Sequence, residues 1–210
     1  MKRIRIGNQT AFSASTPEMP FDFAVAHGFD AFEWFPDRSE SGTGWCEADI
    51  TRERRTAIRE TAIAHDVSLS VHAPWWANPL NPDALDVLFQ GIHFARDIGA
   101  SLFNVHLYLD RGTKAFVEAI APLIDQLTSH AMQLSIENTP LTGPDDFRQL
   151  LHELEAQGLL GPQVGMCLDV GHANLCGATR NDYLRFIDLL APEIPVIHVH
   201  LHENFGDRDS

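Results

Sequence analysis

Residues 164–173, Val-Gly-Met-Cys-Leu-Asp-Val-Gly-His-Ala, decide the fold of this chain. An apolar run typical of a strand ends in a carboxylate, Asp169, and His172 follows three residues later. Four other apolar runs end at or next to a similar side chain: His72, His106, Glu137 and His200. These five strand-end residues recur about every 30 residues, which is the length of one βα unit. The repeat indicates a parallel α/β fold in which successive units each place one polar side chain at a strand end.

The whole chain alternates short apolar runs with longer amphipathic stretches. The runs predict seven strands, at residues 4–7, 31–35, 67–73, 102–107, 132–138, 164–171 and 194–202. The stretches between them predict helices at residues 17–26, 51–65, 82–98, 113–130, 144–157 and 181–190. A long loop at residues 36–49 is expected to lie over a site. We find no linker that would divide the chain and predict one domain, residues 1–210.

The strand-end residues predict a metal site. In a parallel barrel or an open α/β sheet the carboxyl ends of the strands open onto one face, so these side chains should converge. Imidazole and carboxylate together suit zinc, manganese, iron or cobalt. With His172 and Asp209 the set reaches seven candidates, enough for two or three ions or for one ion plus substrate ligands. A single histidine at a strand end is more often a hydrogen-bonded core residue, but the regular repeat favours the metal site.

Further side chains at the same strand ends are candidates for substrate contact. His198 and His202 alternate with His200 along one strand and share its face. We predict His200 as the ligand and His198 as a buried partner, and His202 suits either role. Trp75 follows the third strand on a loop and forms either an aromatic wall for a ligand or packing over the rim. Glu33, at the end of the second strand, either contacts a ligand or neutralises a nearby basic side chain.

The net charge and the cysteine content restrict the classes of binding partner and the cellular compartment that we expect. Fifteen Lys and Arg against 29 Asp and Glu give a net charge of −14, which repels phosphate backbones and anionic lipid headgroups. Nucleic acid is therefore disfavoured as a partner. Three cysteines cannot all pair within one chain, which indicates a reducing compartment. No signal peptide and no apolar run of ~18 residues is present, so we expect a cytoplasmic protein without a membrane partner.

Five motifs in order along the chain resemble those of the xylose isomerase-like TIM-barrel superfamily. They are His72-Ala73-Pro74, Asn104-Val105-His106, Ile136-Glu137-Asn138-Thr139, Leu168-Asp169-Val170-Gly171-His172-Ala173 and His200-Leu201-His202-Glu203-Asn204. The resemblance covers nearly the whole chain and implies a (β/α)8 barrel. Because only seven strands are predicted, we expect a barrel that lacks the eighth βα unit at its C-terminus. The superfamily includes sugar phosphate isomerases and epimerases as well as endonuclease IV, which cuts DNA at abasic sites with three zinc ions.

The epimerase branch gives the leading functional hypothesis. There the resemblance implies that Glu137, Asp169 and His200 hold one divalent ion, Mn, Zn, Co or Mg, and that His172 contacts the substrate. Glu137 would move a proton in an enediolate mechanism on a small, carbohydrate-like hydroxy-carbonyl compound. A second glutamate, which that branch takes from its eighth strand, is missing, and the chain is expected to stop inside a motif.

Two alternatives remain. The endonuclease branch would add His72, His106, His172 and Asp209 as ligands of up to three zinc ions, although the net charge of −14 argues against DNA. A catalytically impaired metal-binding barrel is the third hypothesis. An open seven-stranded barrel exposes edges at its first and last strands, which favours pairing with another chain and therefore a homo-oligomer.

Overall fold

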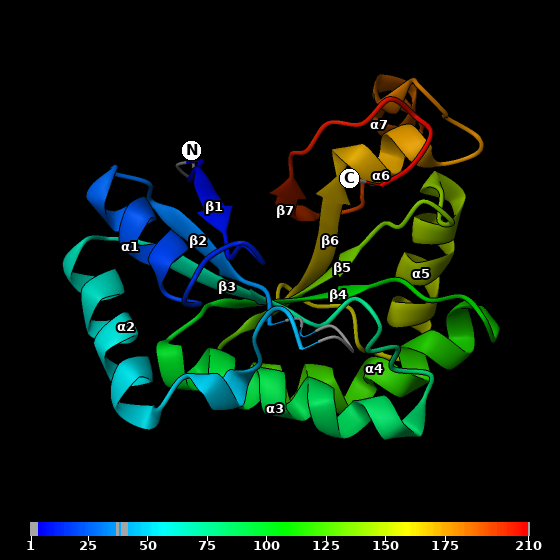
Figure 1. The fold of residues 1–210 in the computed structure, drawn as a ribbon. Coiled ribbons are helices and arrows are strands. Elements are labelled where there is room, and N and C mark those ends of the chain that lie inside the picture. The colour runs from blue at the N-terminus through cyan, green and yellow to red at the C-terminus, as the bar shows by residue number, and fades with distance from the viewer. Residues whose placement is uncertain (1–3, 37, 39–41, 210) are drawn as a thin grey trace. The chain divides into compact units, whose positions relative to one another are not determined.

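The computed structural model describes residues 4–36, 38 and 42–209. Its strands are β1 (Gly7–Gln9), β2 (Ala31–Trp34), β3 (Ser68–His72), β4 (Leu102–His106), β5 (Gln133–Glu137), β6 (Val164–Asp169) and β7 (Val196–His200). Its helices are α1 (Met19–Ala26), η1 (Glu47–Asp49), α2 (Arg52–Ala64), α3 (Pro82–Ile98), α4 (Gly112–Ser129), α5 (Pro144–Ala156), α6 (Val170–Leu175) and α7 (Tyr183–Leu189). Helices and strands alternate along the chain, which confirms the predicted α/β class (Figure 1). Seven strands among the described residues are one fewer than a complete (β/α)8 barrel has.

The chain divides into two compact units, and the boundary falls within α3 and β4. The first unit comprises Met1–Ala77 and Leu85–Phe103. In it β1, β2 and β3 pair in parallel in that order. Its core is aromatic, because Trp34 packs edge-on against the rings of Phe32, Trp45 and Phe94. This core supports β2 and β3, whose ends carry Glu33 and His72.

The second unit comprises Asn78–Ala84 and Asn104–Ser210. Its strands β5, β6 and β7 pair in parallel, and the backbone N–H of Leu107 donates to the carbonyl of Glu137 just beyond the end of β4. A fully buried apolar stripe on α4 and an apolar face of α5 supply much of the core. The pairing of β6 with β7 shifts between Met166 and Cys167, where Ile197 forms a bulge.

Three predicted strands differ from the structure by two or more residues at an end, and of these the seventh, predicted at residues 194–202, spans only Val196–His200. The first strand lies at Gly7–Gln9 and not at residues 4–7. Ile4 and Ile6 are exposed, so these apolar side chains do not contribute to the core. The sixth strand ends at Asp169, two residues earlier than predicted, because the Asp169 carboxylate accepts a hydrogen bond from the backbone N–H of His172 and starts α6. The loop predicted at 36–49 contains η1, and positions 37 and 39–41 of it lie outside the described residues.

None of the helices formed by the described residues has the length and apolar character that crossing a membrane requires.

Candidate functional site

Four strands of the second unit place polar side chains on one face at two levels. Side chains two residues apart along a strand share a face. The upper level, at the carboxyl ends of the strands, consists of His106, Glu137, Asp169 and His200. The lower level, two residues earlier on each strand, consists of Asn104, Ser135, Cys167 and His198. Strand register pairs Asp169 with His200 and Cys167 with His198, so the two levels are stacked on β6 and β7.

The Glu137 carboxylate is the centre of the upper level. Its side chain is 1% exposed. Its Oε1 lies 3.2 Å from Nδ1 of His172 and 3.4 Å from Nε2 of His106, and its Oε2 lies 3.2 Å from Nδ1 of His200. The side-chain amide of Asn104 donates to the same Oε2. Burial of an isolated carboxylate would be costly, so these surrounding groups are what allow Glu137 to lie here.

The Asp169 carboxylate is the second buried anion of the upper level. Its Oδ1 accepts from the backbone N–H of His172 at 2.6 Å and lies 2.8 Å from Nε2 of His202, while Oδ2 lies 3.6 Å from Nδ1 of His200. Burial opposes ionisation of Asp169. Hydrogen bonds with His200 and His202 and the charge of His172 outweigh it and lower the pKa of Asp169 to about 2. The side chain is therefore ionised at neutral pH.

His172 links the carboxylates to the C-terminal segment. Its Nδ1 lies 2.8 Å from the carbonyl oxygen of Asn138, and its Nε2 lies 3.0 Å from Oδ2 of Asp209. Burial lowers the pKa of His172, but the hydrogen bond with Glu137 and the charges of Asp169, Glu137 and Asp209 raise it to about 9. With no ion bound, this imidazolium compensates part of the negative charge. A metal ion would take over that role and displace the proton.

The donor set fits a divalent transition-metal ion. One ligand atom from each of Glu137, Asp169 and His200 lies within 4.8 Å of the other two, and the same holds for Asp169, His172 and His202. Two carboxylates beside several imidazoles suit manganese, zinc, cobalt or iron. Nδ1 of His202 is buried and has no hydrogen-bond partner among the described residues. A metal ion could therefore use this nitrogen without the loss of a hydrogen bond to the described residues.

Three residues predicted for the site belong to the first unit. Glu33 is buried and accepts a hydrogen bond from Ser70 Oγ at 2.8 Å. His72 ends β3, bonds through Nδ1 to the carbonyl of the next residue, and lies 4.4 Å from the ring of Phe35. Trp75 is 60% exposed. Their part in metal or substrate binding stays a prediction.

Sequence reasoning missed the amides that position both carboxylates. Asn104 is fully buried; Ser135 Oγ donates to its Oδ1 at 2.6 Å, which leaves its amide N–H aimed at Glu137. Asn138 Nδ2 donates to the carbonyl of Asp169 at 2.9 Å, and the Asp169 N–H donates back to Asn138 Oδ1 at 2.8 Å. Such partners orient ligands and tune their affinity. The available signal was an asparagine inside or directly after an apolar run.

Gly171 provides the space that the His202 imidazole occupies. A Cβ atom at Gly171 would lie 2.1 Å from Cε1 of His202. We expect Gly171→Ala to displace the ring and break its 2.8 Å contact with Asp169. Loss of a hydrogen bond to a charged group is worth about 1.5–3 kcal/mol, so zinc affinity measured by calorimetry should fall roughly ten- to a hundredfold. Gly177→Ala is the control, because its Cβ would meet nothing within 4 Å; equal affinities for the two variants would contradict the prediction.

Comparisons with known proteins support this fold. Residues 21–210 match the family described as "Xylose isomerase-like TIM barrel". The structure resembles a xylose isomerase domain containing protein from Salmonella typhimurium LT2, with 16% identity and a TM-score of 0.70 over 100% of this chain and 77% of that one. It also resembles a D-tagatose 3-epimerase-like protein, with 17% identity and a TM-score of 0.68 over 96% of this chain and 78% of that one.

A third similar structure is a D-psicose 3-epimerase determined in the presence of D-fructose, with 13% identity and a TM-score of 0.61 over 93% of this chain and 72% of that one. Identities this low establish the fold alone. A search of curated proteins returned no match. The family match spans most of the chain and agrees with the observed alternation of strands and helices, which confirms the predicted TIM-barrel class. The chain therefore belongs to the xylose isomerase-like TIM-barrel family.

Proposed function

We propose that the chain is a divalent-metal-dependent isomerase or epimerase acting on a small, carbohydrate-like hydroxy-carbonyl compound. The observation that supports this most directly is a fully buried carboxylate, Glu137, beside a second carboxylate and an imidazole, Asp169 and His200, whose ligand atoms lie within 4.8 Å of one another. Two of the similar structures are described as an epimerase and an epimerase-like protein, which is the same reaction class.

In the proposed mechanism Glu137, Asp169 and His200 would hold the ion. The bound ion would supply the positive charge that polarises a carbonyl group and makes the neighbouring C–H acidic. Glu137 would then accept the proton from carbon, which converts the substrate to an enediolate. The amide of Asn104 keeps Oε2 of Glu137 in place while this happens. Nε2 of His172, which lies 3.0 Å from Oδ2 of Asp209, would exchange that contact for a hydrogen bond to a substrate oxygen.

Hydrogen exchange at carbon tests this proposal. The protein is loaded with Mn²⁺, Co²⁺ or Zn²⁺ and incubated in deuterated water with a panel of ketoses, aldoses and their phosphates. We expect deuterium at the carbon next to the carbonyl, followed by NMR, and loss of exchange when a chelator removes the ion. Exchange requires only proton removal by Glu137 and return from solvent. Full metal loading without exchange or isomerisation of any compound would contradict the proposal.

A phosphodiesterase of the endonuclease IV type is the second candidate. The observation that favours it is the excess of donors around the two carboxylates, since His106, His172 and His202 all lie within 3.4 Å of a carboxylate oxygen of Glu137 or Asp169. Such a set could hold more than one zinc ion and activate water for attack on phosphate. An abasic-site duplex is therefore included in the same panel. Nicking that a chelator abolishes would favour this candidate, and metal binding without either activity would favour a non-catalytic barrel.

A further inference from the structure

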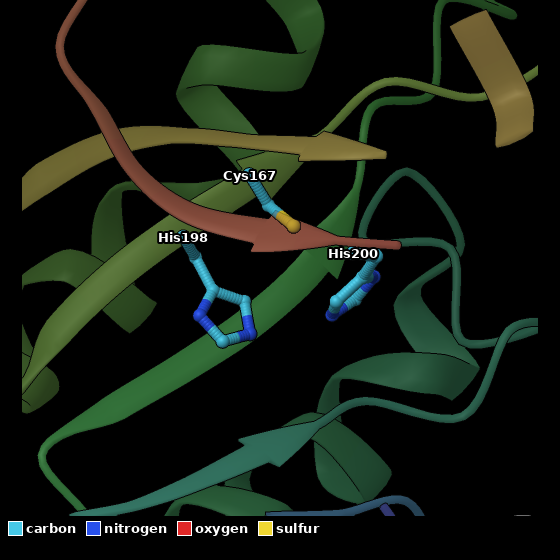
Figure 2. A group of neighbouring side chains, drawn as sticks. All are labelled: Cys167, His198 and His200. Carbon is cyan, nitrogen blue, oxygen red and sulfur yellow. The ribbon is translucent and has the colours of Figure 1, made fainter. Parts of the chain in front are cut away.

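A second group of donor atoms lies directly below the carboxylates. It consists of Cys167 on β6 and of His198 and His200 on β7, and one ligand atom from each lies within 4.8 Å of the other two. Figure 2 shows both imidazoles on the same side of β7, with Cys167 on the neighbouring strand. Only His200 also belongs to the site proposed for catalysis. Cys167 and His198 have no role in the proposed function.

A β-bulge creates this group. Met166 pairs with Val196, but the next residue, Cys167, pairs with His198, so Ile197 is an extra residue in β7. Without the bulge, Cys167 would lie opposite Ile197, and His198 would lie on the other face of the sheet, because side chains alternate along a strand. Bulges re-aim side chains and are common next to functional sites.

The donor types at the lower level differ from those at the upper level. Cys167 is fully buried, and the rings of His198 and His200 lie 5.0 Å apart at 81° to each other. A thiolate with two imidazoles suits Zn²⁺ and other thiophilic ions, whereas hard ions such as Mg²⁺ and Mn²⁺ prefer oxygen ligands. Zinc lies about 2.0–2.3 Å from such donors, so small side-chain rotations bring these three atoms around one ion. The two levels therefore differ in the ions they select.

We propose that Cys167, His198 and His200 form a binding site for a thiophilic metal ion, one level below the carboxylates. The Nδ1 atom of His200 lies 3.2 Å from Glu137 and 3.6 Å from Asp169, so His200 belongs to both levels. A thiophilic ion at the lower site competes with the upper level for this imidazole. Zinc and manganese thus occupy the protein differently, and excess zinc perturbs the upper site through His200.

Cobalt spectroscopy of the reduced, metal-free chain tests the lower site. Co²⁺ bound to a thiolate gives a sulfur-to-cobalt charge-transfer band in the near ultraviolet, which a site of carboxylates and imidazoles lacks. We expect this band in the wild-type protein, and we expect Cys167→Ser to lose the band and one equivalent of bound zinc. His198→Gln should weaken cobalt binding at least tenfold as followed by the same band. Cys176→Ser, which changes the other buried cysteine of the second unit, should keep the band.

The Asp169→Asn variant distinguishes a failure of the lower metal site from a failure of the proposed function. It removes an upper carboxylate, so we expect impaired exchange activity with the charge-transfer band retained. Absence of the band in the folded wild-type protein would overturn the proposal by itself, whatever the variants do. An unchanged band in Cys167→Ser, or a band lost only in Cys176→Ser, would also overturn it. A wild-type protein that shows the band but exchanges no hydrogen contradicts only the proposed function.

Discussion

Glu137→Gln is expected to lower the metal-dependent exchange of carbon-bound hydrogen by about 10²–10⁴-fold, the range for removal of a general base. Glutamine has the shape of glutamate but its amide does not accept the proton. The NH2 group of the glutamine is also badly placed at either oxygen position. One carboxylate oxygen of Glu137 faces His106 and His172, and the other accepts a hydrogen bond from Asn104. Whichever position the new NH2 group takes, it meets a donor. The variant should therefore lose metal affinity as well as turnover.

The measurement is the rate of deuterium incorporation at saturating metal, with metal content checked on the same sample. Glu118→Gln is the matched control, because Glu118 is an exposed residue of α4 that forms an ion pair with Lys114 at 4.0 Å. It removes the same charge and should leave the rate unchanged. A metal-loaded Glu137→Gln protein with the wild-type rate would remove Glu137 from the mechanism.

Asp169→Ala is expected to reduce the free energy of unfolding of the metal-free protein by about 3–5 kcal/mol, the usual effect of removing one partner of a buried charged pair. Asp169 is buried and contacts His172, His200 and His202. Its replacement by alanine leaves these imidazoles without their anion and removes the cap of α6. The fall in the urea midpoint, followed by circular dichroism, measures the effect.

The Asp169→Asn variant separates the two contributions to this loss of unfolding free energy, the charge of Asp169 and its role as a helix cap. Asparagine caps helices about as well as aspartate, so this variant retains the cap but loses the charge, and it should fall between wild type and Asp169→Ala. Asp125→Ala, at an exposed position of α4, serves as the control and should change stability by no more than about 0.5 kcal/mol. A loss in Asp169→Ala of only about 1 kcal/mol would mean that Asp169 acts as a helix cap and nothing more.

Much of the candidate site follows from local sequence pattern. The βα repeat predicted which apolar runs form strands and that Glu137, Asp169 and His200 stand at strand ends, where the structure brings them into one group. It predicted these positions because strand-forming runs and helix periodicity are local properties of the chain. Even so, the repeat did not predict α6, because one hydrogen bond, which the Asp169 carboxylate accepts from the backbone N–H of His172, decides where that helix begins.

The sequence by itself therefore determined the fold class, the family and the residue types at the upper level. Only the tertiary structure decided that Asp209 returns to His172, that Asn104 holds Glu137, and that Cys167 lies opposite His198. The first two contacts join residues more than 30 positions apart, and the third depends on a bulge. The physical reason is that strand register and long-range hydrogen bonds depend on how whole strands pair, which local periodicity does not encode.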